Sequence, residues 1–241
     1  SLSIYRNDKI NNAGALMFAS KVEKFIPHAE SIFASFKGTD KTNIYDRNDV
    51  KDDLLTQFNG AVAFLKKQLN VRSEIRGFDR FDIYEIPLDA LREAVVNAIV
   101  HRNYTINGTS IYVRIFDDRV EIENPGGLPE GITRRDFGKS SVRRNPIIAD
   151  LFHRMGKVER MGSGIERMRE LMRDGGLKEP VFEMDAFFRV TFYRDPRYSL
   201  KADKESGVKP LEKRLGEKVG GKPEKIRSKL GDRLGEKGAE D

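Results

Sequence analysis

Three polar side chains recur at four-residue steps within an otherwise apolar segment. Glu93, Asn97 and His101 lie in residues 91–104, and this spacing places them along one side of a helix. Asparagine is a poor helix former because its side chain competes for backbone hydrogen bonds, so its position here suggests another role. A carboxylate can activate water, and an amide oxygen can bind magnesium. The stripe therefore indicates a site for a nucleotide and a magnesium ion.

Two glycine-containing segments could contact the phosphates of such a nucleotide. The sequence Asn-Pro-Gly-Gly at 124–127 follows an expected strand, so the backbone there must come close to another group. The sequence Gly-Ser-Gly at 162–164 opens an expected helix, whose first N–H groups and positive dipole end favour phosphate. Neither segment is specific alone. The order of all three segments along the chain is what favours a nucleotide site.

Periodicity predicts the elements that must position these residues. Apolar residues at three- and four-residue spacing indicate helices, and alternation of side chains indicates strands. Asn48 or Asp49 is the expected N-cap of the second helix, and Asn145 that of the fourth. The expected helices cover 13–18, 51–69, 88–102, 146–155 and 164–174, and the expected strands cover 29–36, 72–86 with a break at Gly77, 110–116, 119–123, 180–182 and 187–193.

These elements predict an α/β (α+β) fold in the form of a two-layer sandwich. The strand at 29–36 is expected to precede the sandwich in a small N-terminal subdomain. Phe188, Val190 and Phe192 are expected to face the core. We expect a mixed sheet built from 72–85, 110–123 and 180–193, with the helices 51–69, 89–102 and 164–174 on one face.

Composition limits the chemistry. The 241 residues include no cysteine, which excludes disulfides and thiolate zinc sites. The chain has only three histidines, and their wide separation in sequence argues against a histidine metal site. The net charge of +6 permits a nucleic-acid or phosphate partner without requiring one. No apolar run approaches the ~18 residues of a membrane span, so we expect a cytoplasmic protein with no membrane partner. From residue 195 Lys, Glu and Gly dominate, which favours a charged linker over a partner-binding helix.

Four motifs carry a resemblance to a known family. They are Arg92-Glu-Ala-Val-Val-Asn-Ala-Ile-Val-His-Arg-Asn-Tyr104, Asn124-Pro-Gly-Gly-Leu-Pro129, Arg144-Asn-Pro146 and Glu159-Arg-Met-Gly-Ser-Gly-Ile165. The first resembles the N-box of the GHKL (Bergerat-fold) ATPases. Together the motifs are similar to a divergent branch labelled RecG-like helicase C-terminal, or divergent AAA. That branch is found in prokaryotic transcriptional regulators behind a Schlafen AlbA-type DNA-binding domain, and the resemblance extends over about residues 10–194.

The resemblance implies a role for each residue of the stripe. Glu93 matches the catalytic base, and Asn97 matches the magnesium ligand. His101 stands where sensor kinases place a basic phosphate contact, with a structural histidine as the alternative. The implied cofactors are ATP and Mg²⁺.

The resemblance also assigns the two glycine boxes. Gly126 and Gly127 match the first box, and Gly162 and Gly164 match the second. Asn124 stands where the family has an Asp that accepts from the adenine amino group, a departure that bears on adenine specificity. Asparagine can still accept through its carbonyl oxygen.

The stretch between the boxes, residues 128–161, corresponds to the ATP lid. Four polar side chains in it could close on the phosphates, with exposed surface charges as the alternative for the two arginines. These side chains are Ser140, Ser141, Arg143 and Arg144.

The resemblance divides the chain into three parts and gives it a function. Residues 1–48 correspond to the end of a Schlafen AlbA-type region, 49–194 to a GHKL-like ATP-binding domain, and 195–241 to a charged tail. The implied function is a magnesium-dependent ATP-binding regulatory module of a DNA-associated transcriptional regulator, with slow ATP hydrolysis at most. DNA would be bound by domains outside this chain, and ATP would bias a homodimer or a DNA-bound form. No Gly-x-x-x-x-Gly-Lys-Ser/Thr sequence occurs, so the chain contains no P-loop helicase motor.

Two alternatives remain open. A degenerate GHKL domain could serve as a dimerisation or scaffold module without nucleotide, which the Asn124 departure favours. Direct DNA binding through Arg143, Arg144 and the basic tail is the other, although the tail mixes Lys and Glu almost evenly.

Overall fold

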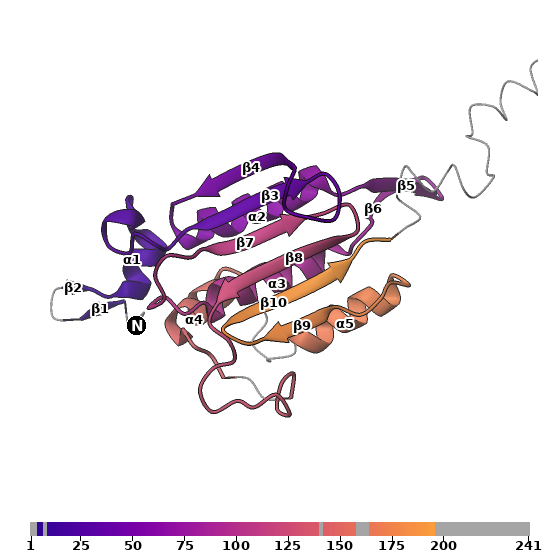
Figure 1. Cartoon of the computed structure of the whole chain (residues 1–241). Coiled ribbons are helices and arrows are strands. Elements are labelled where there is room, and N and C mark those ends of the chain that lie inside the picture. Colours follow the sequence, from indigo (N-terminus) through magenta and orange to yellow (C-terminus); the bar gives the residue numbers. More distant parts are fainter. Residues whose placement is uncertain (1–3, 7–8, 140–141, 158–163, 196–241) are drawn as a thin grey trace, which may run out of the picture. The chain divides into compact units, whose positions relative to one another are not determined.

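A six-stranded mixed sheet forms one layer of the protein (Figure 1). The computed structural model describes residues 4–6, 9–139, 142–157 and 164–195. Strand order across the sheet is β4-β3-β7-β8-β10-β9, and β3 runs parallel to β7 while the other neighbours are antiparallel. The strands are β3 (Ser31–Phe36), β4 (Ile44–Val50), β7 (Ile111–Ile115), β8 (Arg119–Pro125), β9 (Val181–Met184) and β10 (Phe187–Tyr193).

Helices cover one face of this sheet and form the second layer (Figure 1). The three expected on that face are α2 (Leu54–Gln68), α3 (Leu88–His101) and α5 (Gly164–Asp174). Two shorter helices, α1 (Asn12–Phe18) and α4 (Pro146–Arg154), pack against each other and against α2 and α3 respectively. The predicted two-layer sandwich is therefore confirmed. Within the described part of the chain, no helix combines the length and apolar character needed to cross a bilayer.

The start of α2 differs from the expectation. Asp53 is the N-cap, and its carboxylate accepts hydrogen bonds from the N–H groups of Leu55 and Thr56, both at 2.9 Å. The expected caps Asn48 and Asp49 lie instead in β4, because that strand continues to Val50. A carboxylate at this position satisfies two of the N–H groups that a helix leaves without partners.

The composition of the sheet also differs from the expectation. The segment around 72–85 does not join it but forms a separate hairpin of β5 (Val71–Arg76) and β6 (Asp79–Tyr84), which turns at Gly77 with φ 66°. Its place is taken by β3, which was expected in a separate N-terminal subdomain, and by β4, which the sequence did not predict. Apolar alternation shows that a segment is extended but not which strand it pairs with. The expected boundary at residue 48 therefore falls inside a strand of the main sheet.

Alternation along the strands separates a core-facing side of the sheet from an open side. On β8, Val120 and Ile122 are buried beneath the helices, and Asn124 shares their face because it lies two residues further on. On β10, Val190 and Phe192 are buried in the core as predicted, and Phe188 packs against it while partly exposed.

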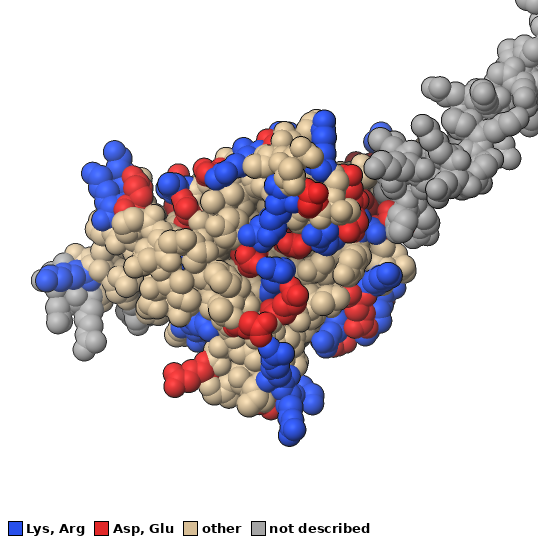
Figure 2. Space-filling model, viewed as in Figure 1, with Lys and Arg blue, Asp and Glu red and all other residues tan. Residues whose placement is uncertain are grey.

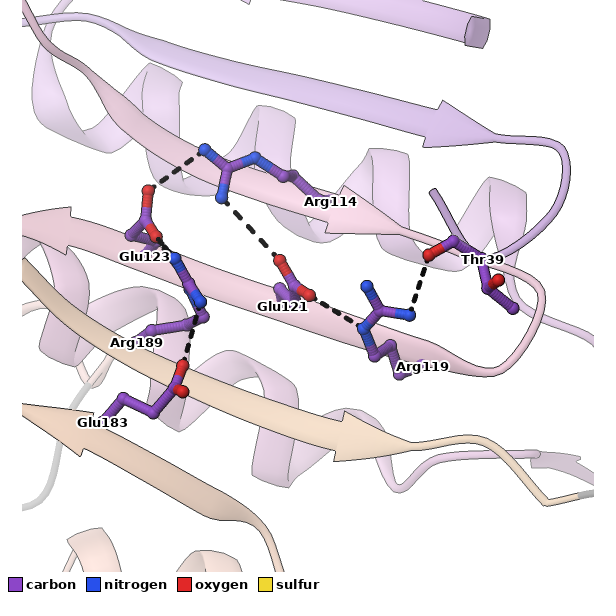
Figure 3. A network of polar contacts seen from close by, with 7 residues as sticks. All are labelled: Thr39, Arg114, Arg119, Glu121, Glu123, Glu183 and Arg189. Atoms are coloured by element: carbon purple, nitrogen blue, oxygen red, sulfur yellow. Dashed lines mark hydrogen bonds and ion pairs between the residues drawn. The ribbon is translucent and has the colours of Figure 1, made fainter. Parts of the chain in front are cut away.

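The open face carries a network of ion pairs across β7, β8, β10 and β9 (Figure 3). Glu123 accepts from Arg114 Nη2 at 3.0 Å and from Arg189 Nε at 2.7 Å. Glu121 accepts from Arg119 Nε at 2.8 Å, while Arg189 Nη1 reaches Glu183 at 2.9 Å. Charges of both signs intermix on this face (Figure 2), so the network is close to neutral overall.

Glu123 is the centre of the network. Its carboxylate is only 6% exposed although it lies on the open face. Burial acts to raise the pKa of Glu123, but the hydrogen bonds and charges of Arg114 and Arg189 outweigh burial and hold this pKa below its ordinary value. The carboxylate is therefore ionised at neutral pH and joins three adjacent strands.

Candidate functional site

The polar stripe of α3 meets the first residue of α5. Asn97 Nδ2 donates to Glu93 Oε1 at 3.3 Å, one helical turn away, and both side chains are partly buried. A Cβ atom added to Gly164 would lie 2.1 Å from Glu93 Oε1 and 3.2 Å from Asn97 Nδ2. Real Cβ atoms do not approach other atoms at 2.1 Å, so a larger residue at position 164 would displace the Glu93 carboxylate from its present place. The structure therefore brings Gly164 into contact with two residues of the stripe, Glu93 and Asn97.

This contact has an electrostatic consequence. The positive end of the α5 dipole lies beside the Glu93 carboxylate, an arrangement that favours negative charge at this point. The same end would favour a phosphate group. Gly162, Ser163, Ser140 and Ser141 lie outside the described residues.

Asn124 approaches the same layer from the sheet. It is 1% exposed, and it lies near the end of β8 on the side that faces α3. Its Nδ2 makes a long contact of 3.4 Å with the carbonyl oxygen of Pro125. A buried amide that faces the helices is in a position to read the polar edge of a ligand.

The glycines at 126 and 127 are required by packing within the protein. Gly126 has φ 98°, and its N–H donates to the carbonyl oxygen of Ala186 at 3.0 Å. A Cβ at Gly127 would lie 2.0 Å from the carbonyl oxygen of Asp185. The sequence correctly predicted a close approach of this loop. The group that approaches it in the structure is the turn between β9 and β10.

Arg144 holds this loop against the end of α3. Its Nη1 donates to the carbonyl oxygen of His101 at 2.6 Å, and its Nη2 donates to those of Gly127 at 2.9 Å and Leu128 at 3.1 Å. Burial lowers the pKa of this guanidinium from its ordinary value. Both sequence-based interpretations of Arg144, a phosphate clamp and an exposed charge, differ from this arrangement, because the guanidinium is partly buried and bonded to three carbonyls. Arg143 is exposed.

His101 is neutral at physiological pH. Burial, together with the nearby charges of Arg144 and Arg143, lowers its pKa from 6.5 to about 4. Its buried Nδ1 has no hydrogen-bond partner among the described residues. These observations disfavour the cationic phosphate contact, because an imidazole in this setting does not carry the charge.

The low pKa of His101 makes a testable prediction about stability. The unfolded chain binds a proton at His101 near pH 6.5, whereas the folded protein does so only near pH 4. The free energy of unfolding should therefore fall as the pH drops from 6.5 towards 4, with a contribution from His101 of roughly 3 kcal/mol. Urea unfolding at several pH values should show a shallower fall for His101→Gln than for wild type.

The histidine on α4 provides the control for this experiment. His153→Gln makes the same substitution on another helix, so it shows whether the loss of any histidine would change the dependence on pH in this way. Parallel curves for wild type and His101→Gln would contradict the assignment of a lowered pKa to His101.

Two polar side chains to which the sequence assigned no such role secure the end of α3. Arg102, 0% exposed, donates through Nη2 to the carbonyl oxygens of His28 and Thr109, both at 2.8 Å. Asn145 Nδ2 donates to the carbonyl oxygens of Val100 and Arg102, both at 2.8 Å. Asn145 precedes α4 as expected, but its side chain makes no capping bond there. An arginine directly after an apolar helix was the available signal, although the sequence does not mark its acceptors, the carbonyls of residues 28 and 109.

Comparison with known proteins identifies the region. A family model described as "Putative ATP-dependent DNA helicase recG C-terminal" matches residues 108–192. This segment contains Asn124 and Gly164, whereas Glu93 and Asn97 precede it. The crystal structure of the DIP2311 protein from Corynebacterium diphtheriae is similar, with a TM-score of 0.68 and 25% sequence identity.

That likeness covers 80% of this chain and 39% of the DIP2311 chain, so this chain spans well under half of the relative's length. No curated protein matches. The matched family and the confirmed sandwich agree on an ATPase-like domain. Residues 108–192 are therefore similar to the RecG C-terminal-like putative ATPase domains.

Proposed function

We propose that this chain binds ATP with Mg²⁺ between α3, the start of α5 and the end of β8. The observation that carries the proposal is the contact of Gly164 with Glu93 and Asn97, which joins a helix N-terminus to a carboxylate and an amide. The match of residues 108–192 to an ATPase-like family supports it independently. Outside this match, the proposal depends on the residues of α3.

The residues present fit a magnesium nucleotide. The described residues contain no group of three or more His, Asp or Glu side chains that could hold a metal ion alone. Magnesium bound to phosphates keeps most of its waters and needs only one or two protein oxygens. Asn97 can supply one of these if its amide group rotates so that Oδ1 faces the ion. When bound, the ion neutralises charge on the phosphates.

Each protein group has a defined part in this proposal. Glu93 orients a water molecule and accepts its proton, which permits slow hydrolysis at most. Gly164 and Gly162 bring the N-terminus of α5 to the phosphates. Asn124 accepts from the amino group of the base. His101 is neutral, so it does not balance the negative charge of the phosphates. In this proposal the helix dipole of α5 and the magnesium ion balance that charge.

The wider role we propose is regulatory. ATP would close the segment 128–161 and so bias a protein that is bound to DNA through other domains. The described part of this segment packs at one end of the sheet, where Phe137 stacks edge-on against Phe182 with centroids 5.2 Å apart. Closure would therefore have to begin from a segment that already contacts β9.

Calorimetry with ATP and Mg²⁺ tests the proposal. Asn97→Ala should weaken binding by at least about tenfold, which corresponds to ~1.4 kcal/mol. Asn48→Ala is the matched control because Asn48 is exposed on the edge strand β4, and this variant should bind as wild type does.

The outcomes separate the alternatives. Equal affinity for wild type and Asn97→Ala would remove Asn97 from the site, and no binding to wild type would remove the site itself. If wild type does not bind ATP and its melting temperature is the same with and without ATP, the alternative of a dimerisation or scaffold module without nucleotide is favoured. That alternative has support in the structure, because packing alone explains Gly126 and Gly127. Direct DNA binding would instead appear as retention of DNA by this chain, and the amount retained would fall steeply as the salt concentration rises.

A further inference from the structure

Asn124 is a buried amide whose oxygen has no partner in the described part of the chain. The residue is 1% exposed, and its side chain makes one contact, the 3.4 Å approach of Nδ2 to the carbonyl oxygen of Pro125. Its Oδ1 accepts no hydrogen bond from any described residue. A buried polar atom that lacks a partner within the protein costs free energy. The binding of a polar ligand would recover that cost.

The amide group of Asn124 is free to turn over, whereas its backbone is fixed. The backbone pairs with that of Phe188 in the ladder of β8 and β10. The contact of Nδ2 at 3.4 Å is near the limit of a hydrogen bond, so rotation of the amide loses little. Asn145 is the contrast, because its Nδ2 donates to two carbonyl oxygens at 2.8 Å each and is held in one orientation. Asn124 can therefore present either its oxygen or its nitrogen to a ligand.

The surroundings of Asn124 suit a planar base better than a phosphate. Asn124 lies beside the carboxyl end of α3, since the carbonyl oxygen of Pro125 accepts from the N–H of Asn103 at 2.8 Å. A helix dipole is negative at this end, and its positive end is the one that favours phosphate. Phe188 lies directly across from Asn124 on β10 and packs against the core. One polar group beside an apolar side chain is typical of a pocket for the apolar part of a ligand.

Adenine and guanine present opposite patterns to an amide. The amino group of adenine donates and the adjacent ring nitrogen accepts, whereas the carbonyl of guanine accepts and the adjacent ring N–H donates. The oxygen and nitrogen of an amide match the adenine pattern in one orientation and the guanine pattern in the other. A carboxylate only accepts, so it matches the amino group of adenine and repels the carbonyl of guanine. The amide at position 124 is thus compatible with both purines.

We infer that the nucleotide site accepts GTP as well as ATP, with the amide of Asn124 turned over between the two. The inference rests on the proposed function, because it concerns the base of the nucleotide whose phosphates lie at the start of α5. It widens the ligand class to purine nucleoside triphosphates. A pyrimidine presents similar groups one ring closer to the sugar, so its edge does not reach Asn124 while the phosphates stay in place.

Calorimetry of the whole chain with Mg²⁺ and ATP, GTP or UTP tests the inference. Wild type should bind GTP with a dissociation constant within about threefold of that for ATP, because each base forms two hydrogen bonds with the amide. UTP should bind at least about tenfold more weakly than either purine nucleotide. GTP should also compete with ATP, as a shared site requires.

Asn124→Asp should separate the two purine nucleotides. At about pH 8 the carboxylate repels the guanine carbonyl, so the ratio of the dissociation constant for GTP to that for ATP should rise at least about tenfold. Asn48→Asp is the matched control, because it makes the same substitution at an exposed position of β4, and its ratio should equal that of wild type. Circular dichroism of each variant checks the fold. The ratio for wild type tests the inference even where a variant does not fold.

Failure of this inference is distinguishable from failure of the proposed function. Binding of ATP but not GTP by wild type would overturn the inference and leave the proposed function in place. An unchanged ratio in Asn124→Asp would also overturn it, as would binding of UTP as tight as that of ATP, because Asn124 would then not read the base. If none of the three nucleotides binds, the nucleotide site and this inference are removed together.

Discussion

Gly127→Ala is expected to lower the free energy of unfolding by about 3 kcal/mol or more. The added methyl group would lie 2.0 Å from the carbonyl oxygen of Asp185, which is part of the backbone and cannot rotate away. Either the loop or the turn between β9 and β10 must move. That movement would also strain the contact of Arg144 with the Gly127 carbonyl. Urea unfolding followed by circular dichroism is the appropriate measurement, because the chain has no tryptophan.

Gly175→Ala is the matched control at the end of α5. The nearest atom to a Cβ at Gly175 is Leu177 Cδ1 at 3.4 Å, an ordinary contact, so the stability should stay within about 0.5 kcal/mol of wild type. If the two substitutions lower the free energy of unfolding equally, the close packing of Gly127 against Asp185 is not the cause of the loss.

Glu123→Ala should have an effect of similar size for an electrostatic reason. The substitution removes the shared partner of Arg114 and Arg189 and leaves two cations, of which Arg114 is 11% exposed in its side chain. Loss of one partner from a buried ion pair costs about 3–5 kcal/mol, and access of Arg189 to water places the expected loss near the lower figure. The midpoint of urea unfolding measures it.

Glu183→Ala separates this effect from a general loss of acidic charge. Glu183 binds the same Arg189 at 2.9 Å, but its side chain is 55% exposed. Its removal should cost less than about 1 kcal/mol. Similar losses for the two variants would show that the network is no more than a set of surface ion pairs.

The sequence was sufficient for most elements because the signals that define them are local. Alternation of Ile111, Val113 and Ile115, followed by the turn at Asp117 and Asp118, predicted the β7–β8 hairpin, and the structure has it. The pairing of strands was not local. The segment 72–86 has the apolar residues of a sheet strand, yet Ile75, Phe78 and Phe81 are exposed. Phe33, in the strand that was expected in a separate subdomain, is fully buried. Periodicity contains no information about which distant strand a segment joins.

The candidate site shows the same division. The convergence of the α3 stripe with Gly164 was predicted from order along the chain, and the structure brings them together. Arg102, Arg144 and Asn145 were not understood from sequence, since each reaches backbone carbonyls of residues that only folding brings near. Arg144 and Asn145 satisfy carbonyls at the carboxyl end of α3, and Arg102 joins that end to the carbonyls of His28 and Thr109. No residue pattern marks the acceptors of such bonds. The nucleotide and its ion remain a proposal.

The parallel pair of β3 and β7 determines when the protein can fold during its synthesis. β3 ends at Phe36 and β7 begins at Ile111, so a ribosome must make α2, the β5–β6 hairpin and α3 before β3 meets its central neighbour. Until then the nascent chain presents Phe33 and an unpaired strand edge to chaperones and to other chains. Closing so long a loop is slow. The protein is therefore expected to depend most on the cell's folding machinery midway through translation, before the matched segment 108–192 has emerged.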